Sequence, residues 1–213
     1  IFGKNMIDAD AINQYTGNDK FTVSLSDPTS TRQIVLNTTR DVLADKEVRQ
    51  ALQHATNKQA ISEGIFYGLE QPADTLFAET IPYCNIGLTP YEYDVEKAKN
   101  ILAEAGWSAG SDGVLEKDGQ KLNIDLLYNS DSVAEKAISE YLQSEYAKIG
   151  ISLNIHGEEE QSYRDSMKAG NFDMVFNICW GTPYDPQSSL AAMRAPVYGD
   201  FAAQQGLEDK ADI

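Results

Sequence analysis

The stretch LNIDLLYNSDSVAEKAISEYLQSEYAKIGISLNIH, residues 122–156, decides the fold class because it places a helix pattern between two strand patterns. From Leu122 to Tyr128 apolar and polar residues alternate, which is typical of a strand with one face in a core. Ser132 followed by Glu135 is a capping box that starts the helix, and Gly150 is a typical stop. The alternation resumes in ISLNIH directly afterwards. The stretch therefore predicts strand, helix, strand.

The same alternation of elements continues toward the C-terminus. A short acidic turn follows, then a helical segment near Tyr163–Ala169 and the strand-like run DMVFNIC at 173–179. A strand–helix–strand–helix–strand order is typical of an α/β layer in which at least part of the sheet is parallel. We therefore expect an α/β fold with a mixed sheet flanked by helices.

The first half of the chain adds two strands and two helical regions to this prediction. Residues 21–39 are rich in β-branched side chains around an Asp-Pro turn and predict two strands. Asp45 is a candidate cap for a helix whose pattern continues, after a break, to Gly68. Asp94 is the cap of a second helix, which stops at Gly106.

Two irregular segments separate these elements. Residues 70–92 contain three prolines and no sustained period, so they predict a long surface loop. The pairs Asp112-Gly113 and Asp118-Gly119 are turn signals and predict a small hairpin that leads into the strand at Leu122.

Composition limits the partners of the chain. Its 213 residues suit one domain or one lobe of a larger protein. The net charge of −16, from 33 acidic and 17 basic side chains, disfavours nucleic acid and anionic membrane surfaces as partners. The chain starts at Ile1 without a methionine and ends as abruptly, so we interpret residues 1–213 as a segment of a longer protein.

The cysteines and histidines carry no metal-binding pattern. Cys84 and Cys179 are far apart in sequence, and two unpaired thiols are favoured over a disulfide, although the sequence leaves the pairing open. His54 lies away from the apolar stripe of its helix and is expected to face solvent. His156 precedes the acidic run GEEE, where a solvated strand end is favoured over a cation site.

The segment ICWGTPYDP, residues 178–186, holds the candidate ligand contacts. Trp180 and Tyr184 follow directly after a predicted strand, on a segment that its prolines and glycine keep irregular. Ligands of open α/β sheets collect outside the carboxyl ends of strands, and two aromatic rings there suit a small-molecule site. Arg194 and Tyr198 follow and could complete its wall. The alternative is that Trp180 fills the edge of the core.

Four blocks of the sequence resemble one family. They are VRQALQHATNKQAI, ADTLFAETIPY, YDVEKAKNILAEAGW and WGTPYDPQSSLAAMRAP with DFAAQQGL after it. Together they resemble the extracytoplasmic solute-binding proteins of ABC importers, in the group that holds oligopeptide, dipeptide and nickel receptors. The last block is most similar to the nickel-binding receptors, and the resemblance covers essentially the whole chain.

This resemblance implies a fold and a function. The fold would be one lobe, residues 1–213, of a two-lobed periplasmic-binding-protein fold of type II that closes over its ligand. The function would be to capture nickel, as a small-molecule chelate, outside the membrane and to deliver it to an ABC permease. We expect a monomer in the periplasm, or one held by a lipid anchor on the outer face of the cell membrane, with no cofactor of its own.

The resemblance also assigns roles to the candidate residues. In the nickel receptors the aromatic residues that match Trp180 and Tyr184 enclose the chelate, and a histidine supplies a metal ligand where this chain has Tyr198. Because a neutral phenol is a poor nickel ligand beside imidazole, we expect no direct protein–metal bond. Peptide receptors have an acid a few residues after the tryptophan, whereas this chain has Gly181-Thr182-Pro183 and its first acid at Asp185.

Two other functions remain as alternatives. The first is a di- or oligopeptide receptor of the same importer family. The second is a hydrolase that would use His156 with Glu158, Glu159 or Glu160, but no catalytic motif supports it. We therefore expect that the chain is not an enzyme.

Overall fold

The computed structural model describes residues 9–25, 30–79, 81–179, 186–194 and 200–205. The helices within them are α1 (Ala9–Tyr15), α2 (Asp41–Ala44), α3 (Lys46–Ala55), α4 (Lys58–Phe66), α5 (Val95–Glu104), α6 (Val133–Ala147), α7 (Glu160–Ala169) and α8 (Pro186–Ala192). The strands are β1 (Arg32–Leu36), β2 (Ser108–Ala109), β3 (Leu115–Lys117), β4 (Gln120–Lys121), β5 (Asn123–Asn129), β6 (Ser152–Glu158) and β7 (Met174–Ile178).

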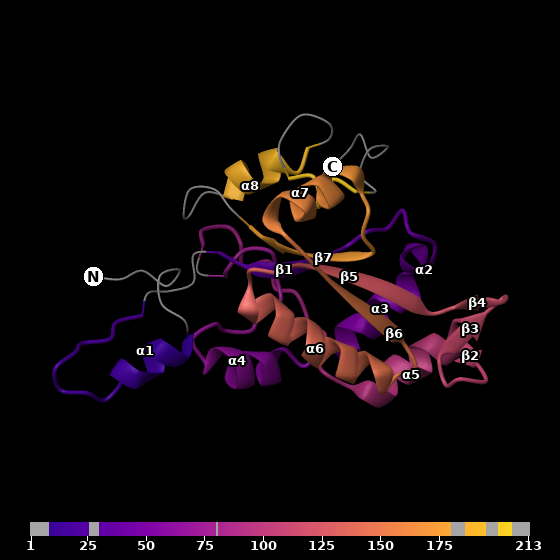
Figure 1. The fold of residues 1–213 in the computed structure, drawn as a ribbon, viewed down its shortest axis with the longest axis horizontal. Helices are drawn as coiled ribbons and strands as arrows, with labels where there is room; N and C mark the ends of the chain where they lie inside the picture. Colours follow the sequence, from indigo (N-terminus) through magenta and orange to yellow (C-terminus); the bar gives the residue numbers. More distant parts are fainter. Residues whose placement is uncertain (1–8, 26–29, 80, 180–185, 195–199, 206–213) are drawn as a thin grey trace.

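A four-stranded mixed sheet in the order β1-β7-β5-β6 forms the centre of the fold (Figure 1). Strand β5 pairs in parallel with both β6 and β7, as two successive strand–helix–strand units require. Strand β1 instead pairs antiparallel with β7, so that Arg32 lies opposite Ile178 and Leu36 opposite Met174. The predicted mixed α/β sheet is confirmed.

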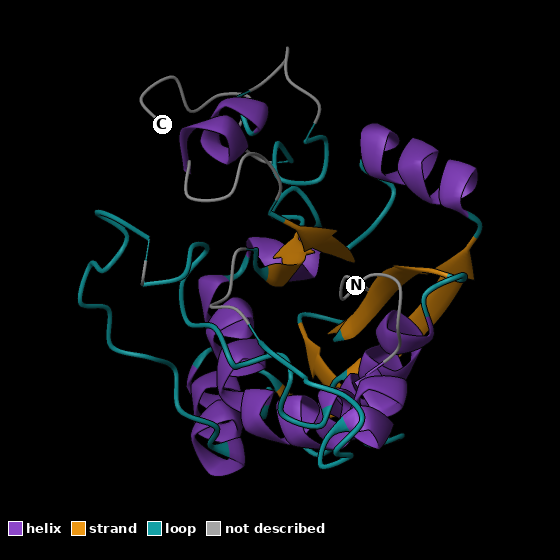
Figure 2. Ribbon diagram, turned by 90° about the vertical axis from the view of Figure 1, so that its left-hand side faces the viewer, coloured by secondary structure: helices purple, strands orange, loops and turns teal. Residues whose placement is uncertain are grey.

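Helices cover both faces of this sheet (Figure 2), and each face has its own hydrophobic core. The larger core joins α2 to α6 to the face that carries the fully buried Leu122, Ile124 and Leu126. The smaller core packs Tyr163 and Met167 of α7 against Leu127 and Val175 on the other face. Leu122, Ile124 and Leu126 are thus buried on one face as the alternation predicts, whereas Met174, Val175 and Phe176 of β7 are buried in succession.

Most local start and stop signals act as predicted. Asp45 accepts a hydrogen bond from the Glu47 N–H, Asp94 from the Lys97 N–H, and Ser132 from the Glu135 N–H. The Asp-Gly pairs form the turns of a separate small sheet of β2, β3 and β4. At Asp118 and Gly119 φ is positive, 51° and 81°, as a two-residue hairpin turn requires.

Two expectations from the sequence are wrong. Residues 21–39 contain one strand, β1, and Phe21–Leu25 form no strand because they have no partner strand in the described chain. His54 is 4% exposed rather than solvent-facing, because the end of loop 70–92 returns over α3. Its Nδ1 lies 2.7 Å from the Glu92 carbonyl oxygen, and its ring meets that of Tyr91 edge to face.

The long loop is held at both of its ends. At the start, Ser62 Oγ donates to the Glu70 carbonyl at 2.5 Å and Lys58 pairs with Asp74. At the return, Tyr93 donates its hydroxyl to Glu145 on α6 at 2.6 Å, and this contact raises the pKa of Tyr93 to about 12. The described residues between them form neither helix nor strand, as predicted, and Tyr83 is fully exposed.

Candidate ligand-binding site

The carboxyl ends of β5, β6 and β7 meet at one edge of the sheet, where the sequence predicts the ligand. Strand β7 ends at Ile178, and the next residue, Cys179, is buried. Cys179 is fixed to the residue before β1, because its N–H donates to the Thr31 carbonyl and its Sγ accepts from the Thr31 N–H at 2.9 Å. The chain therefore leaves the sheet from a fixed point directly before Trp180.

Of the four predicted contact residues, the structure describes Arg194. Trp180, Tyr184 and Tyr198 lie outside the described residues, so their roles stay predictions. Arg194 follows α8 and is exposed, and its carbonyl oxygen accepts from Gln204 Nε2 at 3.4 Å. Cys84 and Cys179 are both free thiols, as the sequence favoured.

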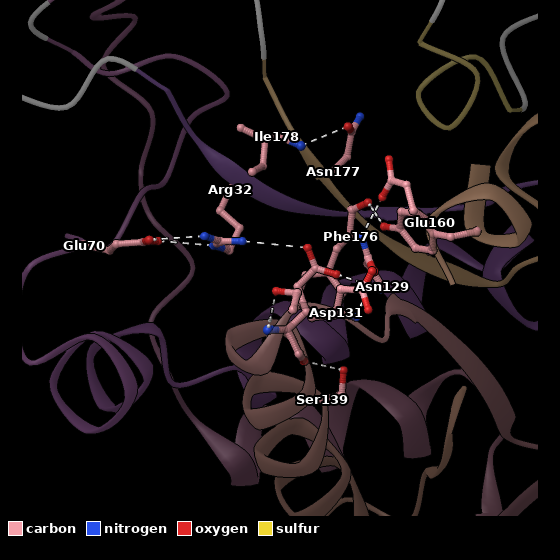
Figure 3. A network of polar contacts seen from close by, with 12 residues as sticks. Arg32, Glu70, Asn129, Asp131, Ser139, Glu160, Phe176, Asn177 and Ile178 are labelled. Atoms are coloured by element: carbon pink, nitrogen blue, oxygen red, sulfur yellow. Dashed lines mark hydrogen bonds and ion pairs between the residues drawn. The ribbon is translucent and has the colours of Figure 1, made fainter. Parts of the chain in front are cut away.

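Arg32 is the centre of a polar network at this edge of the sheet (Figure 3). Its Nε and Nη2 donate to the two carboxylate oxygens of Glu70, at 3.3 and 3.2 Å. Its Nη1 lies 3.9 Å from Glu135 Oε1, and its guanidinium stands over the Phe66 ring at 5.5 Å. One cation thus joins the first strand, the start of the long loop and the first turn of α6.

Glu135 is a buried carboxylate within that network. Its Oε2 accepts the Asn129 N–H at 2.9 Å, at the end of β5, instead of returning to the cap of its own helix. Burial raises the pKa of Glu135, and the Asn129 N–H and Arg32 oppose that rise. The sequence indicated Glu135 only as half of a capping box, and nothing local in it indicates Arg32 as its partner.

The arrangement expected for a hydrolase is not present among the described residues. His156 Nε2 lies 3.3 Å from Asp125 Oδ1, on the exposed part of the sheet. Glu158 accepts hydrogen bonds from Ser162 and Ser166 of α7, and Glu160 pairs with Arg164. No group of three histidine, cysteine or acidic side chains in the described chain could hold a metal ion.

The comparison with protein families shows to which family the chain belongs. Residues 5–200 match the family model "Bacterial extracellular solute-binding proteins, family 5 Middle". The chain belongs to this family. The resemblance noted from the four sequence blocks is therefore confirmed, and so is the type II fold class, of which the chain forms a part.

One relative of this family 5 chain is named a nickel-binding protein, and two similar solved structures hold metal chelates. It is 40% identical, over 97% of its length, to the nickel-binding periplasmic protein of Escherichia coli. A crystal structure of NikA from Brucella suis in complex with Fe(III)-EDTA matches 96% of the chain with a TM-score of 0.87 and 40% identity. NikZ from Campylobacter jejuni, in complex with Ni(L-His), matches 88% with a TM-score of 0.74 and 26% identity.

Peptide receptors are relatives as well. The dipeptide-binding protein of E. coli is 30% identical over 80% of the chain. The chain spans only 40% of the E. coli nickel protein and 41% of the Brucella structure. This family 5 chain is thus similar to part of a larger receptor in every one of these comparisons.

Two surface hollows in the described part of this family 5 chain lie away from the carboxyl edge. One, of about 420 Å³, lies beside α3 and α5 and contains the ion pair of Lys117 with Asp45. The other, of about 370 Å³, lies near the amino end of β5 and contains the pair of Arg40 with Asp173. Arg194, the predicted contact residue that the structure describes, lines neither hollow.

Proposed function

We propose that this chain is part of the substrate-binding component of an ABC importer that captures nickel as a small-molecule chelate. The observation that carries the proposal is the similarity to nickel receptors over nearly the whole chain, 40% identity across 97% of its residues. The likeness in structure to a NikA that holds Fe(III)-EDTA supports a metal chelate as the ligand.

The proposal also covers the cellular location of the receptor and the permease to which it delivers its ligand. The family is one of extracellular solute-binding proteins, and the E. coli relative is named a periplasmic protein. None of the helices in the described ranges is long and apolar enough to cross a membrane. We propose that the full receptor acts as a monomer in the periplasm or on a lipid anchor, closes its two lobes over the ligand and passes it to a membrane permease.

The residue types favour a chelate over a bare ion. Tyr198 stands where the nickel receptors have a histidine, and a neutral phenol binds nickel weakly. The described residues offer no cluster of metal ligands either. The organic part of the chelate would supply the metal ligands, and Trp180, Tyr184 and Arg194 would contact that organic part.

A peptide is the second candidate ligand. The E. coli dipeptide-binding protein and other peptide receptors are relatives at about 30% identity, which keeps this class open. The residues after Trp180 argue against it, since Gly181-Thr182-Pro183 lack the acid that would pair with a peptide's ammonium group. A buried ammonium without a countercharge is costly.

The test is calorimetry on the full-length receptor with four ligands: Ni²⁺ alone, the nickel–histidine complex, Fe(III)-EDTA and a dipeptide. We expect one of the two chelates to bind with 1:1 stoichiometry, and Ni²⁺ alone to bind weakly or not at all. Tight 1:1 binding of the dipeptide, with neither chelate bound, would replace the proposal by the peptide alternative. Tight binding of free Ni²⁺ would show that the protein itself supplies metal ligands.

A further inference from the structure

The two segments that carry the predicted aromatic contacts, 180–185 and 195–199, begin and end at described residues. Their four ends are Cys179, Pro186, Arg194 and Asp200. Cys179 and Asp200 are buried, at 6% and 5% exposure. The contacts among these four ends lie within the described residues.

A partly buried pair of hydrogen bonds joins the end of β7 to the residue that closes the second segment. Asn177 Nδ2 donates to both carboxylate oxygens of Asp200, at 2.9 and 3.1 Å. Asn177 itself is oriented by its other amide atom, because Oδ1 accepts the Ile178 N–H at 2.9 Å (Figure 3). Asn177 is three residues before Trp180, and Asp200 is two residues after Tyr198.

The Asp200 backbone and the Gln204 side chain also hold the end of α8. The Asp200 N–H donates to the Ala192 carbonyl at 3.1 Å, and Gln204 Nε2 donates to that carbonyl at 3.1 Å. The Ala203 N–H donates to Asp200 Oδ1 at 3.1 Å. Ala202, between these residues, is 1% exposed and packs in the smaller core. We call Asn177, Asp200 and Gln204 the anchor cluster.

We propose that the anchor cluster positions the ligand contacts by fixing the end of β7, the end of α8 and the start of the 200–205 turn relative to one another. A residue of extended chain spans at most about 3.5 Å, so a position two or three residues from the Asn177–Asp200 bond has a short reach from it. Three stretches that carry predicted contacts thus start from one buried point. The inference rests on the proposed function for the identity of those contacts.

Asp200 and Gln204 are buried polar side chains, and their burial needs an explanation beyond packing. A carboxylate inside a protein is costly unless hydrogen bonds satisfy it, and an apolar pair of the same volume would serve stability as well or better. The Asn177–Asp200 pair instead fixes an orientation, because the hydrogen bonds between an amide and a carboxylate form in one relative geometry. Supporting contacts of this kind typically change affinity by about 10–100-fold when they are removed behind metal ligands.

The test is a swap of the two side chains in the full-length receptor. Asn177→Asp keeps the acceptor for the Ile178 N–H but loses the donor to Asp200 and places two carboxylates face to face. We expect Kd for the bound chelate to rise about tenfold or more. The double variant Asn177→Asp/Asp200→Asn restores one donor and one acceptor, and we expect Kd to return to within about threefold of the wild-type value.

The fluorescence of Trp180, measured without ligand, tests this inference independently of the proposed function. The 213-residue chain has two tryptophans, Trp107 and Trp180, so in a Trp107→Phe background of this 213-residue chain the fluorescence reports Trp180 alone. We expect Asn177→Asp to change the emission maximum and acrylamide quenching of Trp180, and the swap to restore both. That result in the 213-residue chain, beside a full-length receptor that binds no chelate and no peptide, would sustain the positioning role while the proposed function fails.

Two controls complete the design. Asn154→Asp breaks the corresponding amide–carboxylate contact between Asn154 and Asp125, which is exposed on the sheet away from its carboxyl edge, and should change neither readout. Asn177→Ala removes the donor without adding charge and replaces Asn177→Asp if that variant does not fold. The inference is overturned if the single variants lower the melting temperature but leave both Kd and Trp180 emission unchanged.

Discussion

At the scale of single residues, Glu135 makes the folded chain sensitive to pH. Burial raises its pKa above the ordinary value of 4.5, so the folded chain holds this proton more tightly than the unfolded chain does. The free energy of unfolding must then fall as the pH rises from the ordinary pKa through the raised one. Glu135→Gln keeps an acceptor for the Asn129 N–H but does not titrate.

We therefore expect the stability of Glu135→Gln, relative to wild type, to increase as the pH is raised from about 4 to 7. Urea denaturation at a series of pH values measures this difference. The matched control is Glu140→Gln, which removes a glutamate whose side chain is 56% exposed on the same helix. A Glu135 difference no more pH-dependent than that of the control would contradict the assignment.

At the scale of elements, the end of α6 limits which residue can stand at Gly150. Its φ is +80°, and a Cβ there would lie 2.7 Å from Leu115 Cγ in the hairpin strand β3. Gly113 has a similar φ of +85° but open space around it. We expect Gly113→Ala to cost about 1–2 kcal/mol of backbone strain, and Gly150→Ala to cost about 1–3 kcal/mol more.

Urea denaturation of both variants and of Gly150→Ala/Leu115→Ala tests this comparison. Because Leu115→Ala removes the atoms that a Cβ at Gly150 would meet, the added cost of Gly150→Ala should shrink in that background. Equal costs at Gly113 and Gly150 would show that the helix end moves away from β3 without penalty.

Features that depend on neighbouring residues could be predicted from the sequence, whereas contacts between distant residues could not. Caps such as Asp94 and turns such as Asp118-Gly119 were predicted correctly because their chemistry lies within four residues. His54 was placed wrongly because its partner, the Glu92 carbonyl, is 38 residues away. The contact of Arg32 with Glu135 was not predicted for the same reason.

The candidate site was predictable only in outline. The position of a ligand edge follows from strand order, because β5, β6 and β7 run in parallel and end together. The anchor cluster does not, since Asn177 and Asp200 are 23 residues apart and neither residue type alone indicates burial. Which aromatic rings meet the ligand stays a prediction from the resemblance.

At the scale of the whole molecule, the stability of a Trp180 variant distinguishes two roles. Trp180 either packs in the core of this chain or faces a ligand cleft of the full-length receptor. If it faces a cleft whose other wall lies elsewhere in the receptor, Trp180→Ala in the 213-residue chain should stay within about 0.5 kcal/mol of wild type. The same change should abolish chelate binding by the full-length receptor.

Trp107→Ala is the contrasting control, since Trp107 is 5% exposed in the larger core and its loss should cost about 3–5 kcal/mol. Denaturant melts of the two variants give the comparison directly. A loss of several kcal/mol for Trp180→Ala would assign Trp180 to packing and remove it from the site.

The antiparallel pairing of β1 with β7 has a consequence for the time course of synthesis. Leu36 finds its partner Met174 only after about 140 further residues have been made. At a synthesis rate of about 5–20 residues per second, β1 waits roughly 7 to 28 s for the strand that pairs with it. The nascent chain must therefore stay soluble with an apolar strand unpaired until almost all of the sheet has left the ribosome.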